Sequence, residues 1–197
     1  EKIGEGRYRE VYRIDDNFAL KLLRSCVGKD YLGVHVEFPA QLYTSFQFGI
    51  SDFNRFEYDA YKNFSSRIPS ELRSSFAHIY RAGIFHGRSA SLSDLIVNED
   101  GSVSRPLSEY GAVSDTLFWK RMDAIETMLL DEKIRLADVA DYNTVVQTVN
   151  GTHIPVLVDF KRYGRRTYPF QFWLVSERQL ENKMRRRFQK MRDMHST

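Results

Sequence analysis

Residues 3–12 have the sequence Ile-Gly-Glu-Gly-Arg-Tyr-Arg-Glu-Val-Tyr, and residues 18–23 have the sequence Phe-Ala-Leu-Lys-Leu-Leu. Apolar residues alternate loosely on both sides of the turn at 15–17, which predicts a β-hairpin over residues 7–23. Glycines such as Gly4 and Gly6 let backbone amides approach phosphate oxygens closely. Two glycines beside a hairpin also occur in ordinary turns. The stretch predicts that the chain opens with strands, and a phosphate-binding loop is one of two interpretations of its glycines.

Lys21 lies inside the apolar run of the second strand, where an unpaired ammonium is costly to bury. Glu57 is its predicted partner, because it lies within the apolar stripe of a helix that we expect to begin after Asp52 and to end near Ser65. An ion pair between Lys21 and Glu57 is the favoured interpretation. The alternatives are an exposed lysine on an edge strand and a partly exposed glutamate.

The second half of the chain is predicted to be mostly helical, with one hairpin. Pro106 to Tyr110 is expected to form one helical turn, and Ser114 is expected to cap an amphipathic helix that carries apolar residues from Leu117 to Leu129. Asn150-Gly151, between two β-branched runs, is the strongest short-range signal for a tight hairpin. Ser176 is expected to cap a last helix.

Two acidic motifs follow the amphipathic helix. Asp138 and Asn143 have the spacing Asp-x-x-x-x-Asn, which suits a carboxylate beside an acceptor hydroxyl and an amide on magnesium, although the same spacing is common in solvated loops. Asp159-Phe160 ends the second strand of the hairpin, where a carboxylate suits a magnesium ligand but is also a frequent strand end. All five signals occur together in this order along the chain, and that joint occurrence is far less common than any one signal.

In this order the signals resemble the protein-kinase superfamily: glycine loop, strand lysine, helix glutamate, catalytic loop and Asp-Phe. The resemblance covers nearly the whole chain. It implies an α+β fold of the minimal bilobal protein-kinase-like type. We expect a single domain over residues 1–197, with a β-rich N-lobe over 1–100 and a reduced, helical C-lobe over 101–197.

A narrower resemblance is to the bacterial YrbL (PhoP regulatory network) family of small kinase-like proteins. It rests on four segments. They are Arg55 to Tyr61, Asp94 to Gly101, Leu107 to Tyr110 and Ile154 to Gly164.

The superfamily resemblance implies ATP and Mg²⁺ as cofactors and a role for each matching residue. Gly4, Gly6 and Val11 would cover the nucleotide, Lys21 would hold its phosphates and Glu57 would orient Lys21. Asp138 would be the catalytic aspartate, and Asn143 and Asp159 would bind magnesium. Val97, Asn98 and Glu99 would belong to a hinge beside the adenine that runs to Gly101.

The sequence also departs from the superfamily pattern. Arg9 occupies the place of the third loop glycine, which we expect to stiffen the cover over the phosphates. Leu136-Ala137 replaces His-Arg before the catalytic aspartate, and Lys161 replaces the glycine of Asp-Phe-Gly. Only 38 residues follow Asp159 and none of them forms an Ala-Pro-Glu segment, so we do not expect a usual activation segment.

The charge is unevenly distributed although the net charge is only +3. From Lys161 onward there are eleven Lys or Arg and three Asp or Glu. This basic segment suits recruitment of an anionic acceptor, with a solvated helix face as the plainer interpretation. It has no recognised nucleic-acid motif. No run approaches the ~20 apolar residues of a membrane span, and the lone Cys26 predicts a reducing, cytoplasmic setting.

Three functional hypotheses remain open on sequence grounds. The first is an active phosphotransferase with an unidentified protein, sugar or other small-molecule acceptor. The second is a pseudokinase that binds nucleotide or regulates a partner, and the third is an unrelated α+β interaction domain.

Overall fold

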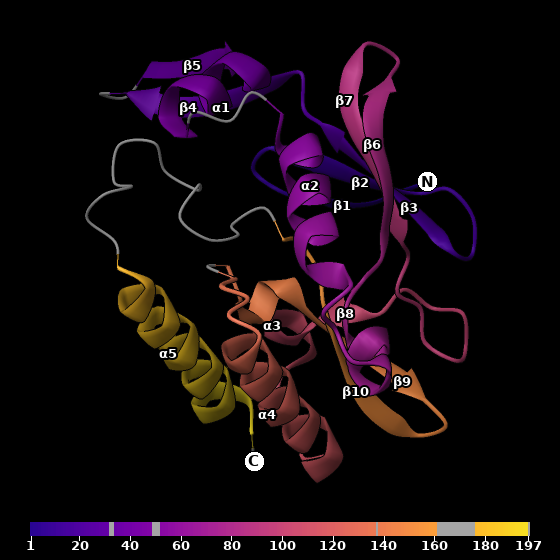
Figure 1. Cartoon of the computed structure of the whole chain (residues 1–197). Coiled ribbons are helices and arrows are strands. Elements are labelled where there is room, and N and C mark those ends of the chain that lie inside the picture. Colours follow the sequence, from indigo (N-terminus) through magenta and orange to yellow (C-terminus); the bar gives the residue numbers. More distant parts are fainter. Residues whose placement is uncertain (32–33, 49–51, 137, 161–175, 197) are drawn as a thin grey trace.

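The computed structural model describes residues 1–31, 34–48, 52–136, 138–160 and 176–196. Figure 1 shows a part rich in strands, built from the first half of the chain, above a part rich in helices, built from the second half. This arrangement confirms the predicted α+β fold class. None of the helices in the described ranges is both long enough and apolar enough to cross a membrane.

An antiparallel sheet of five strands forms the first part. In spatial order the strands are β1 (Lys2–Glu5), β2 (Arg9–Arg13), β3 (Phe18–Leu23), β7 (Arg88–Asp94) and β6 (Ile79–Phe85). The predicted hairpin is present, because β2 and β3 pair antiparallel. In its turn, Asp15 Oδ1 accepts hydrogen bonds from the backbone N–H of Asn17 and Phe18. Val11 and Lys21 lie opposite each other in its register.

Helix α2 (Phe53–Ser65) packs on this sheet and contacts β3, β6 and β7. Asp52 caps it, as the sequence predicted, by accepting a hydrogen bond of 2.9 Å from Arg55 N–H. The buried face of the helix carries Phe64 among its apolar residues and also the fully buried Glu57. The helix thus brings a carboxylate under the sheet.

The structure adds one unit that the sequence analysis left unassigned. Strands β4 (Cys26–Tyr31) and β5 (Val34–Pro39) form a separate antiparallel pair, followed by α1 (Ala40–Phe48). A small core of Leu23, Val27, Ala40 and Tyr43 holds this unit to the end of β3. Figure 1 shows it beyond the N-terminal end of α2.

The second part contains the helices and the hairpin that the sequence predicted, with one corrected helix cap, and also a short strand and two 3₁₀ turns that the sequence did not predict. They are β8 (Arg105–Pro106), α3 (Leu107–Tyr110), α4 (Thr116–Asp131), β9 (Thr144–Val149), β10 (Thr152–Leu157) and α5 (Glu177–His195), joined by the 3₁₀ turns η1 (Ser70–Ser75) and η2 (Asp141–Asn143). The cap of α4 is Asp115, whose Oδ1 accepts from Leu117 N–H at 2.8 Å, and not Ser114. Asn150 and Gly151 both have positive φ, as a two-residue hairpin turn requires.

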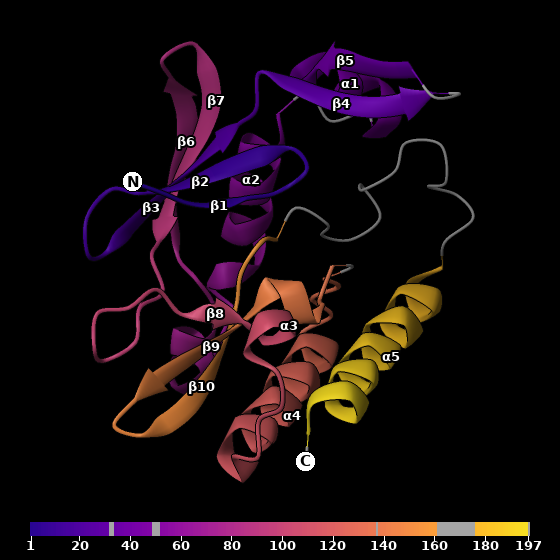
Figure 2. The ribbon, with the colours of Figure 1, turned by 180° about the vertical axis from the view of Figure 1, so that it is seen from behind.

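Helix α5 begins with a complete capping box. Ser176 Oγ accepts from Gln179 N–H at 3.2 Å, and Gln179 Oε1 accepts from Ser176 N–H at 2.7 Å. The buried face of α5 carries Met184, Phe188 and Met191 and packs beside α4 (Figure 2).

One large apolar core crosses the boundary between the two parts. Tyr61 and Phe64 of α2 belong to the same cluster as Phe118 of α4, Leu157 of β10 and Phe188 of α5. The lower end of α2 therefore anchors the sheet to the helical part.

Candidate functional site

A cleft of about 790 Å³ lies between the glycine loop and the second part of the chain. Its volume falls in the usual range for small-molecule sites. Seven residues that the resemblance assigned to nucleotide, metal or catalysis line it together. They are Gly4, Gly6, Val11, Lys21, Asp138, Asn143 and Asp159.

The predicted ion pair is present at the back of this cleft. Lys21 Nζ lies 2.7 Å from Glu57 Oε1, and both side chains are largely or wholly buried. Burial alone would raise the pKa of Glu57, but the charges of Arg9 and Lys21 outweigh it and lower that pKa. Glu57 is therefore a buried carboxylate that stays ionised, and it holds the Lys21 ammonium in place.

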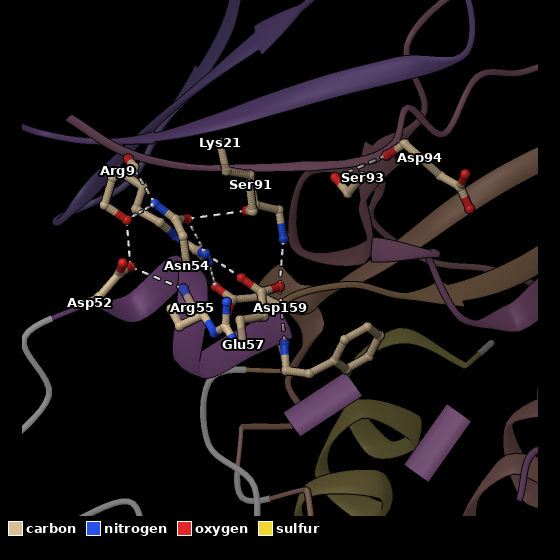
Figure 3. Close-up of polar contacts among 12 residues, drawn as sticks. Arg9, Lys21, Asp52, Asn54, Arg55, Glu57, Ser91, Ser93, Asp94 and Asp159 are labelled. Carbon is tan, nitrogen blue, oxygen red and sulfur yellow. Dashed lines mark hydrogen bonds and ion pairs between the residues drawn. The ribbon is translucent and has the colours of Figure 1, made fainter. Parts of the chain in front are cut away.

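Arg9 does not cover the cleft from above, which is where a loop residue that stiffens the phosphate cover would lie. It begins β2 and its side chain is buried beneath the sheet. Its guanidinium contacts the carboxylate of Glu57 and lies 2.9 Å from Asp159 Oδ2 (Figure 3). Burial opposes its charge, but the carboxylates of Asp159 and Glu57 raise the pKa of Arg9 above its usual value.

Asp159 is held by its neighbour in the chain. Phe160 is buried against the rings of Tyr61, Phe64 and Phe76, with centroid distances of 5.7, 5.3 and 6.3 Å. Its backbone N–H donates to Glu57 Oε1 at 3.2 Å. Asp159 itself has a φ of 66°, a left-handed conformation that is uncommon for a residue with a side chain. Lys161, the departure that follows, lies outside the described residues.

The loop before β9 brings Asp138 and Asn143 to the same cleft. Asn143 Nδ2 donates to the backbone carbonyl of Asp138 at 2.9 Å, which leaves its Oδ1 as the oxygen available for a ligand. Tyr142 Oη donates to Asp138 Oδ1 at 3.3 Å, and Arg187 Nη1 of α5 lies 3.7 Å from the same oxygen. Both Asp138 and Asn143 are buried.

The structure does not bring Val97, Asn98 and Glu99 into the described lining of the cleft. Val97 O accepts from Gln147 Nε2 at 2.8 Å, Asn98 Oδ1 accepts from Thr148 N–H at 2.9 Å, and Glu99 N–H donates to Thr148 O at 3.0 Å. The segment is therefore tied to β9. Val103 to Pro106, which precede α3, line the cleft on this side instead.

The sequence did not predict the roles of two residues of the site, Asn54 and Arg9. Asn54 is fully buried one turn before Glu57 on α2, and its Oδ1 accepts from Arg9 Nη1 and Ser91 Oγ, each at 3.2 Å (Figure 3). From the sequence, Arg9 is only a replacement for the third loop glycine. The available signal was an arginine and an asparagine at core-facing positions, where each needs a polar partner.

The chain resembles solved kinase structures but matches no family model and no curated protein. The kinase domain of PF14_0431 matches with a TM-score of 0.52 and 14% identity, over 83% of this chain and 50% of that one. PpkA-294 in its apo form matches with a TM-score of 0.53 and 21% identity, over 82% and 57%. The bifunctional kinase-methyltransferase WbdD matches with a TM-score of 0.50 and 14% identity, over 96% and 44%.

These matches concern the path of the backbone, since fewer than a quarter of the aligned residues are identical. The chain spans about half the length of each of these structures. Together with the sheet, α2 and the cleft between the two parts, they show that the chain has a protein-kinase-like fold.

Proposed function

We propose that the chain is an ATP- and magnesium-dependent phosphotransferase that acts on a protein, sugar or other small-molecule acceptor. The observation that carries the proposal is the buried Lys21–Glu57 ion pair at the back of a cleft that Asp138 and Asp159 also line. A buried ion pair contributes little stability compared with apolar residues of the same volume. Because the pair of Lys21 and Glu57 lies in the cleft and contributes little stability, a role in binding or catalysis explains it better than a structural role.

The glycine loop supports nucleotide binding on steric grounds. An added Cβ would lie 3.9 Å from Val11 Cβ at Gly4 and 3.7 Å from Arg9 O at Gly6, which are ordinary contact distances. Neither glycine is among those with positive φ. The local fold therefore does not demand glycine at either position, whereas close approach of a phosphate to the backbone would.

The donor atoms that Asp159 and Asn143 bring to the cleft suit magnesium. Asp159 offers a carboxylate and Asn143 an amide oxygen, and Mg²⁺ on nucleotide phosphates commonly takes only one or two protein carboxylates. No group of three or more His, Cys, Asp or Glu gathers in the described part of the chain, so a dense all-protein metal site is not proposed there. When bound, Mg²⁺ would neutralise charge on the phosphates.

The proposed reaction is transfer of the γ-phosphoryl group to a hydroxyl. The acceptor oxygen forms a bond to the γ-phosphorus, the bond from that phosphorus to the bridging oxygen of ADP breaks, and Asp138 accepts the hydroxyl proton. Lys21 would hold the phosphates and Glu57 would orient Lys21. Positioning and charge neutralisation supply most of such catalysis.

A thermal-shift titration with ATP, with and without Mg²⁺, tests the proposal. A ligand that binds only the folded state raises its melting temperature. We expect a magnesium-dependent shift that Lys21→Met and Asp159→Ala abolish and that Lys62→Met, on the exposed face of α2, retains. Asp138→Ala should keep the shift but lose transfer. The absence of any shift at millimolar ATP would remove the nucleotide from the proposal.

A pseudokinase is the second candidate, and the contact between Arg9 and Asp159 favours it. A guanidinium on one oxygen of the proposed magnesium ligand competes with the metal. A nucleotide-induced shift that is independent of Mg²⁺, with no phosphate transfer or ATP hydrolysis, would select this candidate.

The finer assignments also belong to the proposal. We keep the resemblance to the YrbL family, which rests on the four sequence segments given above. A reducing, cytoplasmic compartment is supported by the single cysteine, Cys26, which is exposed and free.

A further inference from the structure

A second cavity, which we call the α5 pocket, lies beside the cleft. It has a volume of about 240 Å³ and lies between the loop after Asp138 and helix α5. Its lining is contributed by four loop residues and four helix residues. They are Val139, Ala140, Asp141, Tyr142, Arg187, Lys190, Met191 and Met194.

The α5 pocket adjoins the proposed catalytic residue. Tyr142 lines both the α5 pocket and the cleft, and its Oη donates to Asp138 Oδ1. Arg187 Nη1 donates to Val139 O at 3.0 Å and lies 3.7 Å from Asp138 Oδ1. A molecule in the α5 pocket would therefore lie next to the carboxylate that we assign to the acceptor hydroxyl.

The charge of the α5 pocket favours an anion. Arg187 and Lys190 bring two cations, and Asp141 brings one carboxylate. That carboxylate has other partners, since Asp141 Oδ2 lies 3.4 Å from His195 Nε2 and its Oδ1 accepts from Tyr142 N–H at 3.0 Å. Met191 and Met194 supply an apolar wall. The lining thus combines a fixed guanidinium and an ammonium with apolar surface, which suits a small organic anion.

We propose that the α5 pocket is the acceptor subsite and that it selects a small acceptor with a phosphate or carboxylate group. The proposal deepens the phosphotransferase function and rests on it. Arg187 and Lys190 bind the anionic group, and the acceptor hydroxyl reaches Asp138 past Tyr142. The contact between Arg187 and Asp138 offsets the repulsion that this carboxylate would exert on an anionic acceptor.

The size of the α5 pocket selects a small molecule over a macromolecule. Its volume is below the ~300–1,000 Å³ that is usual for drug-sized ligands. A phosphorylated or carboxylated metabolite with few carbon atoms fits that space.

The methionines make a direct test possible in the chain of residues 1–197. Of the five methionines, Met191 and Met194 line the α5 pocket, and Met191 also belongs to the large core. Met122, Met128 and Met184 are buried in that core and do not line the pocket. With ¹³C-methyl methionine, NMR reports five signals. We would titrate with inorganic phosphate and separately with acetate, with ionic strength held constant by NaCl and without ATP.

We expect saturable shifts of the Met191 and Met194 methyl signals and none for the three methionines that do not line the pocket. Arg187→Gln and Lys190→Gln should each weaken binding and so raise the half-saturating anion concentration at least fivefold. Arg186→Gln removes the same charge from an exposed position on the same helix and should change it less than twofold. Saturation by phosphate, by acetate or by both supports the subsite and identifies the anion that it prefers.

Linear shifts without saturation up to about 50 mM with both anions, or an equal loss of affinity in all three variants, would overturn the subsite. Saturable binding of a phosphopeptide, with no response to phosphate or acetate, would overturn it in favour of a protein acceptor. Because the titration contains no nucleotide, its failure is distinct from a failure of the ATP and magnesium thermal shift.

Discussion

At the scale of single residues, Arg9 changes the interpretation of the site most. The sequence suggested a loop residue that replaces a glycine, but the side chain lies under the sheet, between Glu57 and Asp159. A buried guanidinium there satisfies two carboxylates at once. It also occupies an oxygen that the proposed metal requires.

Arg9→Met should therefore affect stability and metal binding in opposite directions. Breaking a buried ion pair by removing one partner costs about 3 kcal/mol or more, which denaturant unfolding would measure. Release of Asp159 should lower the Mg²⁺ concentration needed for half of the ATP-induced thermal shift, by roughly tenfold if about 1.4 kcal/mol of competition is removed.

The matched control is Arg13→Met, on the same strand, whose partner Asp16 is exposed. It should leave both quantities nearly unchanged, since exposed pairs contribute about 0–1 kcal/mol. If Arg9→Met binds magnesium no better than the wild type, the guanidinium and the metal do not compete.

At the scale of elements, the position of Glu57 depends on how α2 begins. Asp52 accepts from Arg55 N–H and also from the hydroxyl of Ser89 on β7, so one side chain fixes both the helix start and its contact with the sheet. The first turn of α2 carries Asn54, which donates to Ser89 O at 3.0 Å. The cap therefore supports the polar network behind the cleft.

Asp52→Ala should destabilise the protein by about 1 kcal/mol, the usual cost of a lost N-cap. Because the cap orients Glu57, the variant should also reduce the ATP-induced thermal shift. Asp59→Ala, on the exposed face of the same helix, removes one carboxylate from a surface pair with Arg55 and serves as the control. If the two substitutions lowered the stability and the ATP-induced thermal shift equally, Asp52 would act only through its negative charge and not as a helix cap.

Turn and cap residues close together in the sequence were sufficient to predict most of the helices and strands. The hairpins at 15–17 and 150–151 and the caps at Asp52 and Ser176 depend on residues close together in sequence, and each is confirmed. The strands β4 and β5 gave no comparable signal, because no Asn-Gly or similar turn pair separates their apolar residues. Helix α1 likewise lacks the charged first and last turns that mark helix ends.

The candidate site, like the helices and strands, was predictable from the sequence only in part. The pair of Lys21 and Glu57 followed from the cost of burying each charge alone. The second partner of Glu57 could not be derived in this way, because Arg9, Glu57 and Asp159 come from three distant segments that meet only after α2 packs on the sheet. Val97 to Glu99 failed to reach the cleft lining for a related reason, since their hydrogen bonds to β9 are set by tertiary packing.

At the scale of the whole molecule, the cleft depends on a core that both parts share. Phe64 of α2 is fully buried and lies against Phe76 and Phe160 at 6.3 and 5.3 Å between ring centroids. Phe160 adjoins Asp159, and Glu57 lies two turns before Phe64 on the same helix. The same packing therefore sets the distance between the sheet and the helical part, and with it the geometry of the site.

Phe64→Ala should show whether the two parts fold as one unit. Loss of a buried phenylalanine costs about 3–5 kcal/mol through lost burial and the cavity that remains. If the core is continuous, far-UV circular dichroism and tryptophan fluorescence should report one shared transition at a lower denaturant concentration, because Trp119 of α4 belongs to the same cluster. Leu117→Ala, which truncates an exposed side chain on α4, should shift the midpoint little. Two separated transitions in Phe64→Ala would mean that the sheet and the helical part are stable independently, and the cleft would then be a boundary between two folding units rather than a feature of one.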